Sequence, residues 1–148
     1  MVRSFRKSLR IFERLNQLIN TQCCPGITMA QCQVLLEIEE LEAATTNQLA
    51  KNLKLDKSTL SRTVDSLVKL ELVDRTESPD DRRYKTLILT AEGKHRCESI
   101  HRENDALYEK MFQKLNPSTR DSILNHFNDL IQVMETWYDS GKDDNGCC

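Results

Sequence analysis

The hydrophobic residues of this 148-residue chain change their spacing just after Leu72, and this change constrains the fold more than any other feature. Before Leu72 they recur three and four positions apart, as on one face of a helix. Residues 73–77 and 84–89 instead read as two short strands, joined by the polar stretch 78–83. The helical spacing returns from Thr90 onward. The sequence therefore predicts a mainly α protein with one small β-hairpin.

The composition excludes several classes of protein. With four glycines and three prolines, the chain has little material for an all-β sandwich, and no glycine-rich phosphate loop can be written from it. Neither HExxH nor GxSxG occurs, and no nucleophile has an evident base, so we expect no enzyme. No apolar run approaches the roughly 18 residues of a membrane helix, and the N-terminus lacks the apolar stretch of a signal peptide. We therefore expect a cytoplasmic protein with no membrane partner.

Capping residues predict where the helices begin. Thr28 with Gln31, and Thr45 with Gln48, form capping boxes, in which each side chain bonds the other residue's backbone N–H. Asp, Thr or Asn precedes each later helix as a capping residue. Together with the amphipathic start of the chain, these signals predict helices at about 1–20, 28–41, 47–53, 56–70, 90–115 and 116–137.

The helix predicted at 56–70 has one apolar and one polar face. Its inward stripe is expected to be Leu60, Val64, Leu67 and Leu70. Its opposite stripe is polar throughout and comprises Ser58, Ser61, Arg62, Asp65 and Lys69.

The predicted elements follow the order of a winged helix-turn-helix, which is a short helix, a turn, a second helix and a hairpin. In that arrangement the second helix enters the DNA major groove, and residues near its N-terminus reach the base edges. Arginine can bind guanine bidentately, and serine or threonine can bond either base type. The candidate contacts on this helix are Lys57, Ser58, Thr59, Ser61 and Arg62.

The hairpin tip adds a second set of candidate DNA contacts. Arg82 and Arg83 stand where a guanidinium can enter a narrow minor groove, whose negative potential is enhanced. Phosphates would repel Asp81, so its expected role is to orient an arginine. The alternative is an ordinary helix-turn-helix with a solvated charged hairpin.

The charge balance alone does not indicate a nucleic-acid partner. The formal net charge is −2, whereas residues 43–93 hold nine Lys or Arg against eight Asp or Glu, a net of +1. A DNA-binding hypothesis therefore depends on where the charges lie.

Several segments of the chain share the pattern of one family. They are Leu49-Ala50-Lys51-Asn52-Leu53, residues 56–62 and 70–73, Ser78-Pro79-Asp80-Asp81-Arg82-Arg83, and Leu87-Ile88-Leu89-Thr90-Ala91-Glu92-Gly93. Over about residues 5–138 the chain resembles the multiple-antibiotic-resistance regulator (MarR) family, with Ser78 in place of the usual acidic residue before the wing proline. The resemblance implies a homodimer joined by its N- and C-terminal helices, which binds double-stranded DNA at a pseudo-palindromic operator. It also implies a repressor that a ligand or oxidation releases.

The resemblance and the helix pattern together suggest a domain organisation. We expect one domain at 1–138, with the DNA-binding part at about 28–90, dimerisation helices at about 3–20 and 91–138, and a flexible tail at 139–148. The apolar surface of the terminal helices exceeds what a winged helix can cover, and pairing with a second subunit would bury it.

We do not expect the six cysteines to form a disulfide framework, because the cytoplasm keeps thiols reduced. Cys23 and Cys24 lie at the break after the first helix, and Cys32 follows in the early turns of the second. Three thiolates there could bind a soft ion such as arsenite, zinc or another soft metal as an effector. They could instead sense oxidation, or Cys32 could be a small buried hydrophobic residue beside an incidental pair.

Two further cysteine positions carry weaker hypotheses. Cys97 and His101 are four residues apart on one helix face, which is metal-ligand spacing, although Cys97 also fits the apolar seam. Cys147 and Cys148 end the predicted tail as further thiols. No cofactor is required by any of these interpretations.

The first hypothesis is thus a dimeric, sequence-specific transcriptional regulator. One alternative is a winged-helix module that binds protein and not DNA. Another is a repressor that responds to a small aromatic or phenolic ligand while its cysteines are structural.

Overall fold

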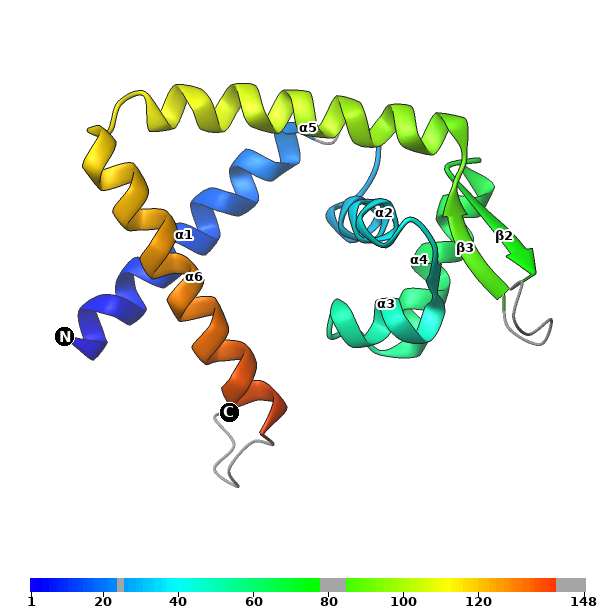
Figure 1. The fold of residues 1–148 in the computed structure, drawn as a ribbon, viewed down its shortest axis with the longest axis horizontal. Helices are drawn as coiled ribbons and strands as arrows, with labels where there is room; N and C mark the ends of the chain where they lie inside the picture. Colours follow the sequence, from blue (N-terminus) through cyan, green and yellow to red (C-terminus); the bar gives the residue numbers. More distant parts are fainter. Residues whose placement is uncertain (24–25, 78–84, 141–148) are drawn as a thin grey trace. The chain divides into compact units, whose positions relative to one another are not determined.

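The computed structural model describes residues 1–23, 26–77 and 85–140. In chain order these residues form α1 (Val2–Cys23), α2 (Met29–Leu41), β1 (Ala44–Thr45), α3 (Thr46–Asn52), α4 (Lys57–Lys69), β2 (Val73–Glu77), β3 (Lys85–Leu89), α5 (Ala91–Phe112) and α6 (Pro117–Asp139). The mainly α fold with a β-hairpin is confirmed (Figure 1).

The capping residues begin the helices where the sequence predicted. Thr28 and Gln31 form a complete capping box at α2, and Thr45 and Gln48 form another at α3. Asp56 caps α4, and Asn116 caps α6 with Pro117 in the first turn. The long helix α5 ends at Phe112, earlier than the expected end near residue 115.

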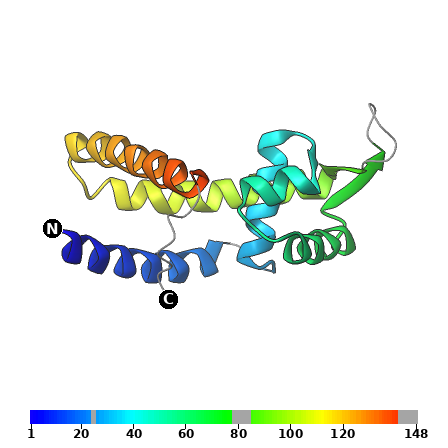
Figure 2. The same ribbon diagram turned by 90° about the horizontal axis from the view of Figure 1, so that it is seen from below.

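The helices α2, α3 and α4 gather beside the β2–β3 hairpin (Figures 1 and 2). Leucine, isoleucine and valine side chains from these elements form one hydrophobic cluster. Its largest fully buried members include Leu35, Ile38, Leu49, Leu60 and Leu67. At about 1.5–3 kcal/mol for each large side chain removed from water, this cluster is the main source of stability in the DNA-binding part.

One core prediction is wrong. Leu70 was expected to face inward, but its side chain is 46% exposed. The helical spacing no longer applies there, because α4 ends at Lys69 and Leu70 is its C-cap. Leu72, at 4% exposure, enters the core instead.

The sheet has three antiparallel strands in the order β1–β3–β2. Val73 pairs with Leu89 and Arg75 with Leu87 in the hairpin, while Ala44 pairs with Leu87 across β1. The sequence did not predict β1, which has only two residues. By pairing with β3, it attaches the connection between α2 and α3 to the hairpin.

The start of α5 is seated on the segment after α4. Thr90 Oγ1 donates a hydrogen bond of 2.7 Å to the Glu71 carbonyl oxygen and accepts one of 2.9 Å from the Gly93 backbone N–H. The Thr90 backbone N–H donates to the Leu72 carbonyl oxygen at 3.1 Å. A Cβ atom at position 93 would lie only 2.0 Å from that oxygen, so this contact requires glycine.

The chain divides into two compact units, residues 1–104 and 105–148. In the second unit, no residue of α6 is buried among those that the structure describes. The helix presents an apolar stripe to solvent that consists of Ile123, Phe127, Ile131, Met134, Trp137 and Tyr138. Exposed hydrophobic residues also run along α1, namely Phe5, Ile11, Phe12, Leu15 and Leu18. Within the described ranges, no helix is long and apolar enough to cross a membrane.

We predict that Gly93→Ala destabilises the DNA-binding part, because the added methyl group must displace the Leu72 backbone. We expect the free energy of unfolding to fall by about 1–3 kcal/mol or more, since about 1–3 kcal/mol is typical of an overpacked core. Denaturant unfolding followed by circular dichroism measures it. The control is Lys94→Ala at the next, exposed position, which should change stability by less than about 0.5 kcal/mol. Equal stability of the Gly93→Ala variant and the wild type would refute the close contact.

Candidate nucleic-acid interface

The N-terminus of α4 is held by the Asp56 carboxylate. Its Oδ1 accepts a 2.6 Å hydrogen bond from Ser58 Oγ and a 2.8 Å hydrogen bond from the Thr59 backbone N–H. Hydrogen bonds from Ser58 and then Thr59 hold the pKa of Asp56 well below its usual range. The cap therefore stays ionised at neutral pH and satisfies a backbone donor that the first helical turn leaves without an intrahelical partner.

The predicted contact residues of α4 lie together on the surface at the start of the helix. Lys57, Ser58, Ser61 and Arg62 are exposed, and Thr59 is half-buried. The Arg62 Nε–H donates to the Ser58 carbonyl oxygen at 3.3 Å, which lays the side chain along its own helix. Two cations and two exposed hydroxyls are thus presented within the first two turns of α4, where Leu60 is buried.

The other predicted contacts cannot be placed. Asp81, Arg82 and Arg83 lie outside the described residues, and their roles stay predictions. The strands β2 and β3 that lead to them pair from Val73–Leu89 to Glu77–Lys85. Across this hairpin the Thr76 Oγ1 hydroxyl donates to the Thr86 carbonyl oxygen at 3.4 Å.

Sequence reasoning missed the polar contacts that hold the helices to their neighbours. Gln31 Nε2 donates to Ser66 Oγ at 2.7 Å between α2 and α4, and Asn52 Nδ2 donates to Glu37 Oε1 at 2.7 Å between α3 and α2. Arg75 of β2 forms an ion pair with Asp65 of α4. Residues 31, 52 and 75 lie far along the chain from their partners, so local sequence patterns gave no signal for these pairs.

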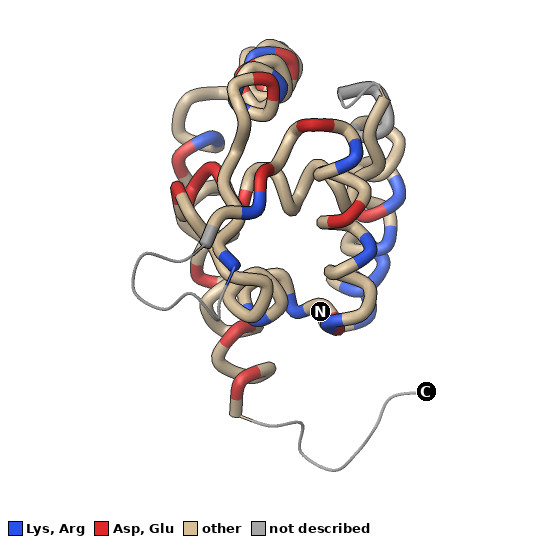
Figure 3. Tube along the Cα trace, turned by 90° about the vertical axis from the view of Figure 1, so that its right-hand side faces the viewer, with Lys and Arg blue, Asp and Glu red and all other residues tan. Residues whose placement is uncertain are grey.

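Basic and acidic positions are interspersed along the chain trace (Figure 3). This agrees with the small net charge of −2. A DNA-binding hypothesis for this chain therefore depends on where individual cations lie, such as Lys57 and Arg62 on α4, and not on a uniformly basic surface.

The structure describes part of the predicted cysteine site. Cys32 is 4% exposed, α1 ends at Cys23, and Cys24 lies outside the described residues. Within the described ranges, no three His, Cys, Asp or Glu side chains are grouped to hold a metal ion. The Cys23, Cys24 and Cys32 site stays a prediction.

Cys97 belongs to the hydrophobic cluster, where its side chain is fully buried. Burial, and next the negative charge of Glu39, raise the pKa of this thiol to about 11. It is therefore a neutral thiol near pH 7, which favours packing over metal ligation. His101 Nε2 lies 2.6 Å from Glu39 Oε2 and joins α5 to α2.

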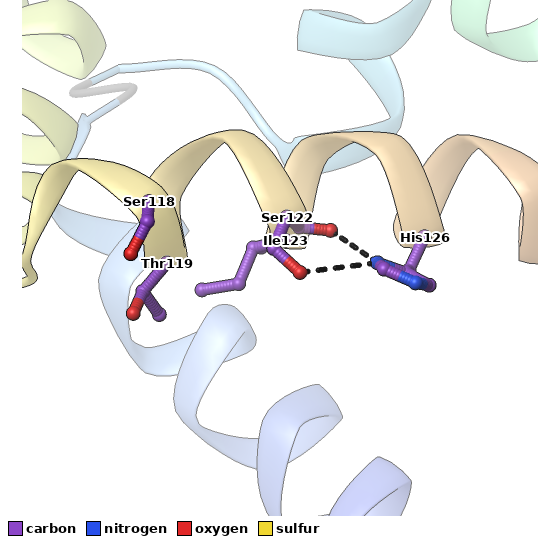
Figure 4. Close-up of a pocket in the computed structure, with 5 residues that line it drawn as sticks. All are labelled: Ser118, Thr119, Ser122, Ile123 and His126. Atoms are coloured by element: carbon purple, nitrogen blue, oxygen red, sulfur yellow. Dashed lines mark hydrogen bonds between the residues drawn. The ribbon is translucent and has the colours of Figure 1, made fainter.

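A depression on α6 is lined by Ser118, Thr119, Ser122, Ile123 and His126 (Figure 4). A serine beside a histidine can form a nucleophile site, but here His126 Nδ1 donates to the Ser122 carbonyl oxygen at 2.6 Å. A ring nitrogen that donates this proton cannot accept one from the Ser122 hydroxyl, 3.3 Å away. The pair therefore lacks the base that nucleophilic catalysis needs.

The comparisons with known proteins agree with this geometry. The model of the MarR family matches residues 26–83. The HTH-type transcriptional regulator YhbI of Bacillus subtilis is 29% identical over 132 residues, which cover 88% of this chain and 86% of YhbI. The multiple antibiotic resistance protein MarR of Salmonella typhimurium is 30% identical over 105 residues, which cover 70% of this chain and 73% of MarR.

Solved structures show the same fold. A cysteine-to-serine mutant of MarR from E. coli in complex with operator DNA has a TM-score of 0.63 at 25% identity, covering 83% of this chain and 95% of MarR. BpsR of Bordetella bronchiseptica has a TM-score of 0.72 at 23% identity, covering 86% of this chain and 98% of BpsR. Its structure concerns regulation of its DNA binding by 6-hydroxynicotinic acid.

The winged helix-turn-helix is the fold of DNA-binding transcriptional regulators. The chain belongs to the MarR family, which is a family of regulators and not of enzymes.

We predict that Arg62→Ala weakens binding to the cognate DNA by about 1–3 kcal/mol and leaves the fold intact. Fluorescence anisotropy with labelled duplexes measures the affinity. A loss confined to the preferred sequence would show that Arg62 reads a base, and an equal loss on every sequence would make it a phosphate contact. The charge-matched control is Lys110→Ala in the second unit. Unchanged affinity of the Arg62→Ala variant would remove this residue from the interface.

Proposed function

We propose that the protein is a homodimeric repressor that binds a pseudo-palindromic operator and that an effector releases. The observation that carries the proposal is the exposed start of α4, with Lys57 and Arg62 in its first two turns. The buried stripe of α4 packs in the hydrophobic cluster, and the strands β2 and β3 follow it along the chain. The family membership supports DNA binding.

In the proposed complex α4 enters the major groove. Lys57, Ser58, Thr59, Ser61 and Arg62 contact bases and phosphates, because only the start of a recognition helix reaches the floor of the groove. Arg82 and Arg83 enter the adjacent minor groove, with Asp81 orienting one of them.

The apolar surfaces of α1 and α6 support the dimer. Trp137 is 57% exposed and Phe127 is 44% exposed, which is unusual for large aromatic side chains of a soluble chain. We propose that the helices at 3–20 and 91–138 pair with those of a second copy, and that 28–90 is the DNA-binding part of a single domain at 1–138. Two-fold symmetry would place two recognition helices about one DNA turn, roughly 34 Å, apart.

Two effector classes are proposed for the release. In the first, arsenite, zinc or an oxidant acts on Cys23, Cys24 and Cys32, which flank the connection between α1 and α2. In the second, a small aromatic ligand acts and the cysteines are structural. The burial of Cys32 and the regulation of BpsR by an aromatic acid favour the second candidate.

Selection of DNA from a random-sequence pool tests the function directly. We expect the protein to enrich an inverted repeat and to lose affinity as salt rises, since binding releases counterions from phosphates. Transcription from a promoter that carries the selected repeat should fall when the protein is added. If no sequence is enriched, a module that binds protein alone becomes the better interpretation.

We predict that Phe127→Glu abolishes dimerisation, because it places a charge in the centre of the apolar stripe of α6. Analytical ultracentrifugation should give the monomer mass, or an aggregate if folding and association are linked. The matched control is Asn125→Glu, which adds the same charge on the opposite side of α6 and should leave the dimer intact. A stable Phe127→Glu dimer would place the interface elsewhere.

For the effector, we predict that Cys24→Ser and Cys32→Ser each keep DNA binding and lose release by arsenite or zinc. A tenfold release needs about 1.4 kcal/mol of differential affinity, which is modest beside metal–thiolate binding. Titration of the protein–DNA complex with arsenite, zinc and peroxide measures the release. Cys97→Ser, at a buried core position, is the control. If both variants respond as the wild type does, the cysteines are packing residues and the aromatic-ligand candidate stands.

A further inference from the structure

Two adjacent residues hold the recognition helix from two sides. Ser66 Oγ accepts the hydrogen bond from Gln31 of α2, and Asp65 forms the ion pair with Arg75 of β2. Because neighbouring side chains on a helix point about 100° apart, α4 cannot rotate about its axis without breaking one of these contacts.

Asp65 is an acidic residue on the stripe of α4 that is proposed to face DNA. It shares this stripe with Ser58, Ser61, Arg62 and Lys69, and its side chain is 48% exposed. A carboxylate that faces phosphates weakens binding unless a cation neutralises it. Arg75 supplies that cation.

The strand register explains why Arg75 points toward α4. Arg75 pairs with Leu87 and Val73 pairs with Leu89, so these four side chains lie on one face of the hairpin. Val73, Leu87 and Leu89 are buried in the core. Arg75 therefore leaves the sheet on its core-facing side, at the margin of the core, where α4 packs.

The position of Arg75 also links it to the wing. It lies two residues before the end of β2 at Glu77, after which the chain continues to the proposed minor-groove arginines. The ion pair therefore joins the middle of β2 to α4.

From these observations, and resting on the proposed DNA-binding function, we infer that Asp65 and Arg75 are a positioning pair. The pair sets the angle between the recognition helix and the wing, so that both reach one operator half-site. Arg75 acts through Asp65 and does not contact phosphate.

A double-mutant cycle with Asp65→Asn, Arg75→Met and the double variant tests this inference. The probes are the duplex that the full-length wild type selects from a random pool and a duplex of scrambled sequence. We expect each single variant to bind the selected duplex about two- to fivefold more weakly, as for an exposed ion pair. The double variant should be no weaker than the worse single variant, because the two residues act as one unit. Binding to the scrambled duplex should change little.

The salt dependence separates positioning from direct contact. A positioning residue leaves the slope of log K against log salt unchanged, whereas loss of a phosphate contact reduces it by about one. Asp74→Asn is the matched control, because it removes a charged side chain from the opposite face of β2, where Asp74 pairs with Ile88. It should bind both duplexes as the wild type does. Thermal unfolding of every variant checks the fold.

Three results would overturn the inference. They are tighter binding by Asp65→Asn, additive effects in the double variant, and a reduced salt slope for Arg75→Met. If the wild type selects no sequence, the proposed function itself fails. If the wild type binds a specific sequence and the variants bind it with the same affinity, the positioning pair is refuted and the proposed function stands.

Discussion

The contact between Gly93 and the Leu72 carbonyl oxygen is the constraint on which the arrangement of the DNA-binding part depends. It joins the end of α4, the start of β2 and the start of α5 within a few residues. Thr90 adds two hydrogen bonds at the same point, to Glu71 and from Gly93. Because backbone meets backbone there, no side chain can adjust to relieve a clash, and the direction of α5 is set by the segment that follows the recognition helix.

The hydrophobic core and the polar contacts of the DNA-binding part have different roles. Leu60, Val64 and Leu67 fix the depth at which α4 lies against its neighbours. Such apolar contacts are non-directional, so they leave rotation about the helix axis weakly defined. The buried stripe sets which face of α4 points inward, and Gln31 and Arg75 add directional bonds to adjacent residues that limit rotation of the helix. The stability of the DNA-binding part and the orientation of α4 therefore depend partly on different residues.

Much of the fold could be predicted from local sequence patterns, because capping boxes and strand alternation are signals within a few residues. Thr28, Thr45, Asp56 and Asn116 each cap a helix as expected. The two-residue strand β1 has no pattern of its own, and Leu70 was misplaced because periodicity does not show where a helix ends. On the site, helical spacing predicted a polar stripe with Ser58, Ser61 and Arg62, and these three side chains are exposed. The Asp65–Arg75 pair depends on strand register, which only the folded chain defines.

The exposed apolar stripe of α6 has a consequence for how much regulator is active. In the proposed dimer this stripe is covered only by association, so the amount of DNA-binding species grows with the square of the monomer concentration while the protein is scarce. A modest change in synthesis would then produce a larger change in operator occupancy. Dilution during cell growth would likewise relieve repression more sharply than it lowers the concentration of chains, which makes the switch steeper without any cooperative contact on the DNA.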